Sequence, residues 1–75
     1  MSGVPTDVPI RGDMIRLGQL LKLAGVVAGG GEAKLLLADG DVLVNGEREM
    51  RRGRQLAPGD VVVVGEVELR VVGPS

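Results

Sequence analysis

The first half of the chain carries apolar residues at helical spacing. Leucine, alanine and valine recur at positions 17, 20, 21, 24 and 27, whereas Gln19 and Lys22 fall on the opposite face. This period predicts a short amphipathic helix over residues 17–25, ending near Gly25. We interpret the preceding residues, 14–16, as a short strand rather than as a first helical turn.

A second helix is predicted after a break at three consecutive glycines, residues 29–31. It begins at residue 31 or 32 and runs to about residue 38. Its inner stripe is formed by Ala33, Leu36 and Leu37. Leu35 departs from that stripe, so it either packs against the sheet or lies exposed.

The second half alternates apolar and polar residues between tight turns, which is typical of strands. Asn45-Gly46 is a strong hairpin signal between a strand at 42–44 and a return strand at 47–49. Residues 57–60, Ala-Pro-Gly-Asp, place proline and glycine where a type II turn needs them. Two further strands are predicted, a buried one over residues 61–64 and an alternating one over residues 67–71.

The length of 75 residues allows one small domain. Its core must be built mainly from 13 valines and 10 leucines, because the chain has no Phe, Trp or Tyr. Valine favours strands and leucine suits either element, which indicates a mixed helix-and-strand architecture. We expect a flexible N-terminal tail over residues 1–9, a single domain over residues 10–72 and a tail over residues 73–75.

The side chains that carry most enzyme chemistry are missing. The chain has no cysteine and no histidine, and its hydroxyl side chains, Ser2, Thr6 and Ser75, lie near the termini. A thiolate or histidine metal ligand and a positioned serine nucleophile are therefore excluded. The sequence Asp39-Gly40-Asp41 lacks the rest of a calcium-loop spacing and fits a helix stop followed by a turn. We predict that the protein is not an enzyme and uses no metal or cofactor.

The cellular compartment is likewise predicted from features that the sequence lacks. No segment of the sequence approaches the apolar length of a membrane span. The first 14 residues lack the cationic start and apolar run of a signal peptide. We therefore expect a cytoplasmic protein with no membrane partner.

The charges nearly balance overall but are unevenly distributed. Nine basic and ten acidic residues give a net charge of −1 at pH 7. Arg48, Arg51, Arg52 and Arg54 nevertheless fall close together, opposed there only by Glu49. An anionic partner would relieve the repulsion within this cluster, and arginine forms bidentate contacts with phosphate. A solvated surface loop balanced by Glu47 and Glu49 explains arginine clusters in general equally well. In this chain the shortage of hydroxyl and other catalytic side chains favours binding.

The glycine run is a second candidate for anion binding. It precedes a predicted helix whose free N–H groups and positive dipole end attract phosphate. Lys34 lies in the first turn of that helix, where a cation is unfavourable unless an anion is near. A flexible turn between two helices is the simpler interpretation of the glycines taken alone.

Five short blocks appear in one order along the chain. They are RLGQLLKLA at 16–24, GGEAK at 30–34, VLVNG at 42–46, RRGRQL at 51–56 and PGDVV at 58–62. This order resembles the S-four (S4) RNA-binding domain, named for ribosomal small-subunit protein four. The resemblance covers about residues 14–65 and is closest to small standalone bacterial members with a Gly-Gly-x-Ala-Lys and Arg-Arg-Gly-Arg pattern.

The resemblance implies an α+β fold in which two short helices pack on a small, strongly bent, mostly antiparallel sheet. It also implies that the two helices and the following loop form a surface for structured RNA. Where many members have a Ser-Arg pair, this chain has glycines, whose backbone N–H groups would make the contacts. The RNA-binding residues expected on this surface are Lys22, Gly30, Gly31, Lys34, Arg48, Arg51, Arg52 and Arg54.

The predicted function is that of a non-catalytic, monomeric RNA-binding module. The expected partner is ribosomal RNA or a tRNA-like RNA, on the ribosome or its assembly intermediates. The absence of aromatic residues argues against sequence reading of splayed single strands, and recognition of duplex shape and backbone needs no stacking platform. The alternative is a small adaptor domain that binds protein and no nucleic acid, since the net charge is near zero.

Overall fold

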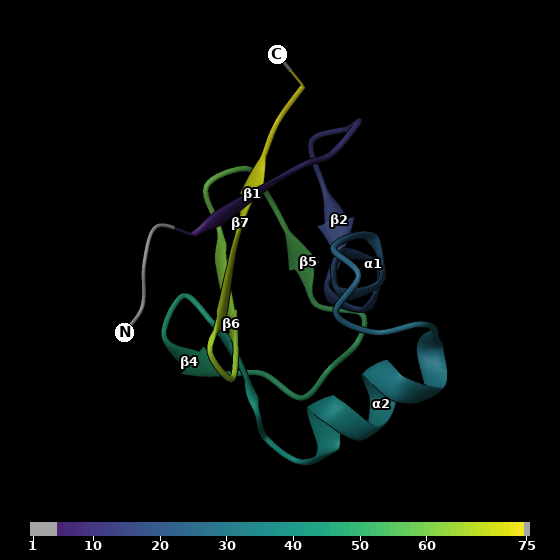
Figure 1. Ribbon diagram of the computed structural model, residues 1–75. Coiled ribbons are helices and arrows are strands. Elements are labelled where there is room, and N and C mark those ends of the chain that lie inside the picture. The colour runs from purple at the N-terminus through teal and green to yellow at the C-terminus, as the bar shows by residue number, and fades with distance from the viewer. Residues whose placement is uncertain (1–4, 75) are drawn as a thin grey trace.

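The computed structural model describes residues 5–74. These residues form two helices and several short strands around a hydrophobic core, and Figure 1 shows how the elements are arranged. The elements in chain order are β1 (Thr6–Pro9), β2 (Ile15–Arg16), α1 (Leu17–Leu23), α2 (Gly30–Ala38), β3 (Val42–Val44), β4 (Glu47–Arg48), β5 (Gln55–Leu56), β6 (Val61–Val64) and β7 (Val67–Val72).

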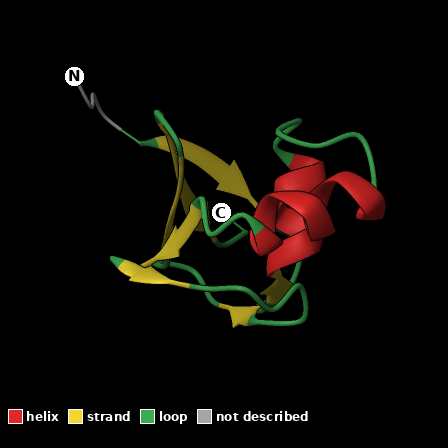
Figure 2. Cartoon of the chain, turned by 90° about the horizontal axis from the view of Figure 1, so that it is seen from below, coloured by secondary structure: helices red, strands yellow, loops and turns green. Residues whose placement is uncertain are grey.

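The strands form one five-stranded sheet, in the order β1-β7-β6-β3-β4, and a separate pair, β2-β5. The pair β1-β7 is parallel, and the remaining pairs are antiparallel. Both helices lie together on one side of the strands (Figure 2). The predicted α+β class, with two short helices on a mostly antiparallel sheet, is therefore confirmed.

The core is aliphatic throughout and follows the two periods of the sequence. Helix α1 buries Leu17, Leu20 and Leu21, which are spaced three and four residues apart on one face. Strands β3 and β6 bury every second residue, and β7 buries Leu69 and Val71, two positions apart. The largest fully buried side chains are Leu17, Leu20, Leu21, Leu37, Leu56, Val42, Val44, Val62 and Val71. Burying each of them contributes about 1.5–3 kcal/mol.

Several predicted elements are confirmed with small shifts. The strand at residues 15–16 and the second helix are present, although the helix already begins at Gly30. Helix α1 ends at Leu23, two residues early, and Gly25 then takes a positive φ of 77°. Leu35 is 68% exposed and takes no part in the core. Strand β6 alternates buried and half-buried valines and is not buried throughout.

Strand β1 corrects the expectation of a flexible tail over residues 1–9. It pairs in parallel with residues 69–72, and its Val8 is only 5% exposed. Pro9 does not prevent this pairing, because a proline is tolerated in an edge strand and β1 lies at the edge of the sheet. The predicted domain therefore begins before residue 10. Residues 1–4 lie outside the described residues, and a tail from residue 73 stays a prediction.

The hairpin turn between β3 and β4 and the turn between β5 and β6 are tied to each other. Asn45 and Gly46 have φ values of 52° and 86°, as the tight hairpin turn requires. The side-chain oxygen of Asn45 accepts the N–H of Val61 at 2.9 Å, and its amide donates to Asp60 at 3.1 Å. Asp60 in turn accepts the N–H of Ala57 at 2.8 Å. Asn45 thus holds the hairpin turn against the predicted 57–60 turn, in which Gly59 has a φ of 100°.

Replacing Asn45 tests this junction. Asn45→Ala removes both side-chain hydrogen bonds and places at positive φ a residue that tolerates this conformation less well than asparagine does. We therefore expect a loss of about 2 kcal/mol in unfolding free energy. Asn45→Gly removes the same bonds but suits the backbone, so its loss should be smaller. Urea denaturation measures both. A neutral Asn45→Ala variant would show that the side chain does not tie the turns together.

Candidate nucleic-acid interface

The arginine loop, defined as residues 49–54, is attached to the start of α1 through its backbone. The N–H of Leu17 donates to the carbonyl of Arg54 at 2.9 Å, and the N–H of Gly18 donates to that of Arg52 at 3.0 Å. These N–H groups would have no partner within the helix, because the first turn of a helix leaves its donors free. The short pairing of β2 with β5 continues the attachment. The loop and α1 are therefore held side by side although they are far apart in sequence.

This attachment creates a groove with a cationic lining, which we call the basic groove. Its volume is about 670 Å³, and it lies between α1, the arginine loop and one residue of α2. Its lining residues are Arg16, Gly18, Gln19, Lys22, Ala33, Arg51, Arg52 and Gly53. Among the described residues that line it, four are cationic and none is acidic. Charges of one sign around a hollow concentrate the field and attract an anion.

A second, smaller hollow adjoins the arginine loop. It has a volume of about 480 Å³ and is lined by Arg51, Gly53, Arg54 and Gln55. Arg51 and Gly53 line both hollows. The side chain of Arg51 is 76% exposed, which leaves it open to a ligand in either hollow.

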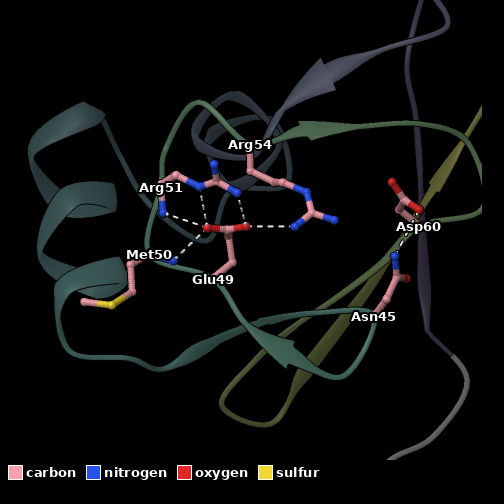
Figure 3. A network of polar contacts seen from close by, with 6 residues as sticks. All are labelled: Asn45, Glu49, Met50, Arg51, Arg54 and Asp60. Atoms are coloured by element: carbon pink, nitrogen blue, oxygen red, sulfur yellow. Dashed lines mark hydrogen bonds and ion pairs between the residues drawn. The ribbon is translucent and has the colours of Figure 1, made fainter.

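The arginine loop is organised by Glu49, the buried charged residue of the described chain, which is 7% exposed. One carboxylate oxygen accepts the N–H groups of Met50 and Arg51 and the Nε–H of Arg51, all at 3.1 Å. The other accepts Nη1–H of Arg54 at 2.8 Å. Figure 3 shows the carboxylate between the two guanidinium groups. Both oxygens are therefore satisfied from within the loop.

Hydrogen bonds keep Glu49 ionised despite its burial. Hydrogen bonds lower the pKa of Glu49 from 4.5 to about 2. The largest effects come from the side chains of Arg51 and Arg54, in that order, and the next largest comes from the backbone N–H of Arg51. The carboxylate neutralises part of the charge of two arginines. The expected repulsion among the three loop arginines is thus partly relieved from inside the protein. Arg52 makes no ion pair within the part of the chain that the structure describes.

The structure brings four of the predicted binding residues together. Lys22, Arg51 and Arg52 line the basic groove, and Arg54 lines the smaller hollow. Lys34 is exposed on α2, next in sequence to the groove residue Ala33. Arg48 lies over Gly40 instead, where an added Cβ would meet its Nε at 3.3 Å.

Sequence reasoning missed two polar groove residues, Arg16 and Gln19. With Lys22 they recur at every third position, so they lie close to one face of the first helix and its preceding residue. The sequence pattern places Gln19 and Lys22 on the polar face of the first helix, but Arg16 was not included in that face. Extending the period one step toward the N-terminus would have found it.

The first turn of α2 already contains a negatively charged side chain of the protein itself, that of Glu32. Gly30 and Gly31 are the first two residues of the helix, and a side-chain oxygen of Glu32 accepts the N–H of Ala28 at 2.8 Å. A carboxylate in the first turn is favoured by the helix dipole. A phosphate bound at these glycines would therefore meet Glu32 as well as Lys34.

The described residues contain neither a metal-binding cluster nor a membrane-spanning helix. In that part of the chain, no group of three or more acidic side chains is placed to hold a metal ion. The same residues include no helix of the length and apolar character needed to cross a membrane.

Comparison with known proteins gives two matches. A family model described as the S4 domain matches residues 8–72. A Bacillus subtilis (strain 168) protein named "Probable ribosome maturation protein RlbA" is 53% identical over 49 residues. The aligned part covers 65% of this chain and 69% of that relative.

The pairing of Glu49 predicts how stability depends on pH. Because its pKa is lower in the folded protein, Glu49 contributes fully above about pH 4.5, and this contribution is lost as the pH falls toward 2. At pH 7 we expect Glu49→Gln to lower the unfolding free energy by about 1–3 kcal/mol, because charge-assisted hydrogen bonds are lost. The difference between the two proteins should shrink on acidification, as measured by urea denaturation at several pH values. A difference that stays constant down to pH 2.5 would contradict the lowered pKa, since Glu49 would then take up its proton at the same pH in the folded and the unfolded state.

Proposed function

This chain belongs to the S4 domain family, and we propose that it binds structured RNA through the basic groove, without catalysing a reaction. S4 domains are an RNA-binding family, and the matched relative is named as a ribosome maturation protein. The observation that carries the proposal is the groove itself. It places Arg16, Lys22, Arg51 and Arg52 around one hollow in a chain whose net charge is only −1.

The chemistry of this groove suits the phosphate backbone of folded RNA. Arginine presents a planar fork of N–H donors that matches phosphate oxygens. Duplex RNA is recognised mainly by its shape and by contacts to phosphates and 2′-hydroxyl groups. Binding of splayed bases commonly uses aromatic side chains, of which this chain has none. A stem or stem-loop is therefore the proposed ligand class.

We further propose that the RNA is ribosomal or tRNA-like and that the protein acts as a cytoplasmic monomer on the ribosome or its assembly intermediates. The name of the Bacillus subtilis relative supports the ribosomal assignment. A binding role without catalysis, metal or cofactor is supported by the side-chain inventory, which has neither cysteine nor histidine.

The predicted residues take different parts in this proposal. Arg51 and Arg52, with Lys22 and the added Arg16, contact phosphates in the basic groove, and Arg54 contacts a neighbouring phosphate from the smaller hollow. Lys34 extends the surface along α2, and the N–H groups of Gly30 and Gly31 are the outermost contacts. Arg48 is the predicted residue with the weakest support, because its side chain lies over Gly40.

Salt dependence tests whether phosphate contacts drive binding. If about four phosphates are neutralised, the logarithm of affinity should fall with the logarithm of salt concentration at a slope of roughly −3 to −4. Titrations of an RNA hairpin at several salt concentrations give the slope. Failure to bind at about 50 mM salt, or a flat dependence, would contradict the proposed function.

A matched pair of variants tests the location of those contacts. Arg52→Gln removes one groove cation, so we expect roughly tenfold weaker binding and a salt slope shallower by about 1. Arg70→Gln removes the same charge from β7, where Arg70 pairs with Asp7, and should change affinity by less than about twofold. Equal effects of the two variants on hairpin binding would show that net charge, and not the groove, sets the affinity.

A further inference from the structure

We propose that Glu49 is a positioning residue for RNA binding, which sets the arginine loop in its binding geometry before the RNA arrives. This inference rests on the proposed function, because it concerns the same groove. Glu49 lines neither hollow and carries the charge that phosphate repels. Its part in binding would therefore be indirect, through the arginines that it holds.

The contacts of Glu49 fix the path of the loop as well as its side chains. Its own N–H donates to the carbonyl of Val42 at 3.0 Å, which anchors the residue to β3. Its carboxylate then accepts the next two backbone N–H groups, those of Met50 and Arg51. The loop thus leaves the sheet in one direction, and its far end is fixed on α1 through the carbonyls of Arg52 and Arg54.

The side-chain contacts leave the outer donors of both arginines available. Arg51 meets the carboxylate side-on, with Nε–H at 3.1 Å and a weaker Nη2 contact at 3.4 Å. Arg54 uses Nη1. Guanidinium has five N–H donors, so each arginine keeps donors with no partner in Glu49. In Arg51, a residue that lines both hollows, these include both N–H groups of Nη1.

Holding two arginines in place has a consequence for affinity. A free arginine side chain loses much rotamer freedom when it binds a phosphate, and this loss weakens binding. Glu49 orders Arg51 and Arg54 during folding, so less freedom remains to be lost when RNA binds. The cost is a negative charge near the bound phosphates, which weakens binding by direct repulsion.

These two effects have opposite signs, which makes the proposal testable. If Glu49 acted only through its charge, Glu49→Gln would strengthen RNA binding. If it positions the arginines, the same change should weaken binding even though the protein becomes more positive by one unit. Glu47→Gln is the matched control, because Glu47 is an exposed glutamate two residues away, in β4.

The experiment compares wild type, Glu49→Gln, Glu49→Asp and Glu47→Gln in binding an RNA hairpin at one salt concentration and pH 7. We expect Glu49→Gln to bind about five- to tenfold more weakly, from the ordering of two side chains. Glu47→Gln should bind as well as wild type or up to about twofold more tightly. Glu49→Asp keeps the charge but has a shorter reach, so it should fall between wild type and Glu49→Gln.

A second readout separates positioning from a general loss of structure. In ¹⁵N NMR spectra of the free protein, the Nε–H signals of Arg51 and Arg54 should move in Glu49→Gln toward those of solvent-exposed arginines. The amide signals of Leu20 and Val62, which are fully buried, should stay in place. If Glu49→Gln does not fold, Glu49→Asp is the deciding variant, with weaker binding and displaced arginine signals expected.

The outcomes distinguish this inference from the function on which it rests. If the wild-type protein binds no RNA hairpin, both the proposed function and the role of Glu49 are overturned. Wild type that binds, together with a folded Glu49→Gln that binds as tightly as Glu47→Gln, overturns only the role of Glu49. Wild-type affinity in Glu49→Asp with displaced arginine signals also overturns it, because the arginines would then bind RNA equally well without being held.

Discussion

An ionised carboxylate that is almost fully buried destabilises the fold unless it is well paired. Glu49 meets this requirement with two backbone N–H groups and two guanidinium groups, and the arginine loop takes its shape from those contacts. The loop in turn presents the carbonyls of Arg52 and Arg54 to the first N–H groups of α1. One buried charge thus connects the sheet, the loop and the first helix, and the basic groove lies where they meet.

The aliphatic core explains why so small a domain can carry this surface. Leu17, Leu20 and Leu21 are completely buried, so α1 has its apolar face fixed against the core. Its other face is then free to present Gln19 and Lys22 to the groove. The nearly neutral net charge conceals this arrangement, because the acidic residues other than Glu49 are distributed over other parts of the chain, and the described acidic residues do not line the two hollows.

Much of the fold follows from local sequence patterns, and the misses come from non-local contacts. The helices follow from the spacing of leucines, and the hairpin follows from Asn45-Gly46, because each depends on nearby residues. Strand β1 was missed because its partners, residues 69–72, lie more than 60 positions away. The four arginines of the cluster were recognised from their close spacing in the sequence. The burial of Glu49 was not predicted, because alternating glutamates at 47 and 49 resemble one exposed polar edge. Only the tertiary structure shows that one is buried and the other exposed.

The central claim is that RNA binds along α1 and the arginine loop. Titration of ¹⁵N-labelled protein with an RNA hairpin, followed by NMR at each backbone amide and arginine Nε–H, tests it most directly. The account predicts the largest changes at Gln19, Lys22 and residues 51–54, with smaller ones at Gly31 and Lys34 on α2. Changes confined to the far strands, such as β1 and β7, would contradict it, as would a spectrum that RNA leaves unchanged.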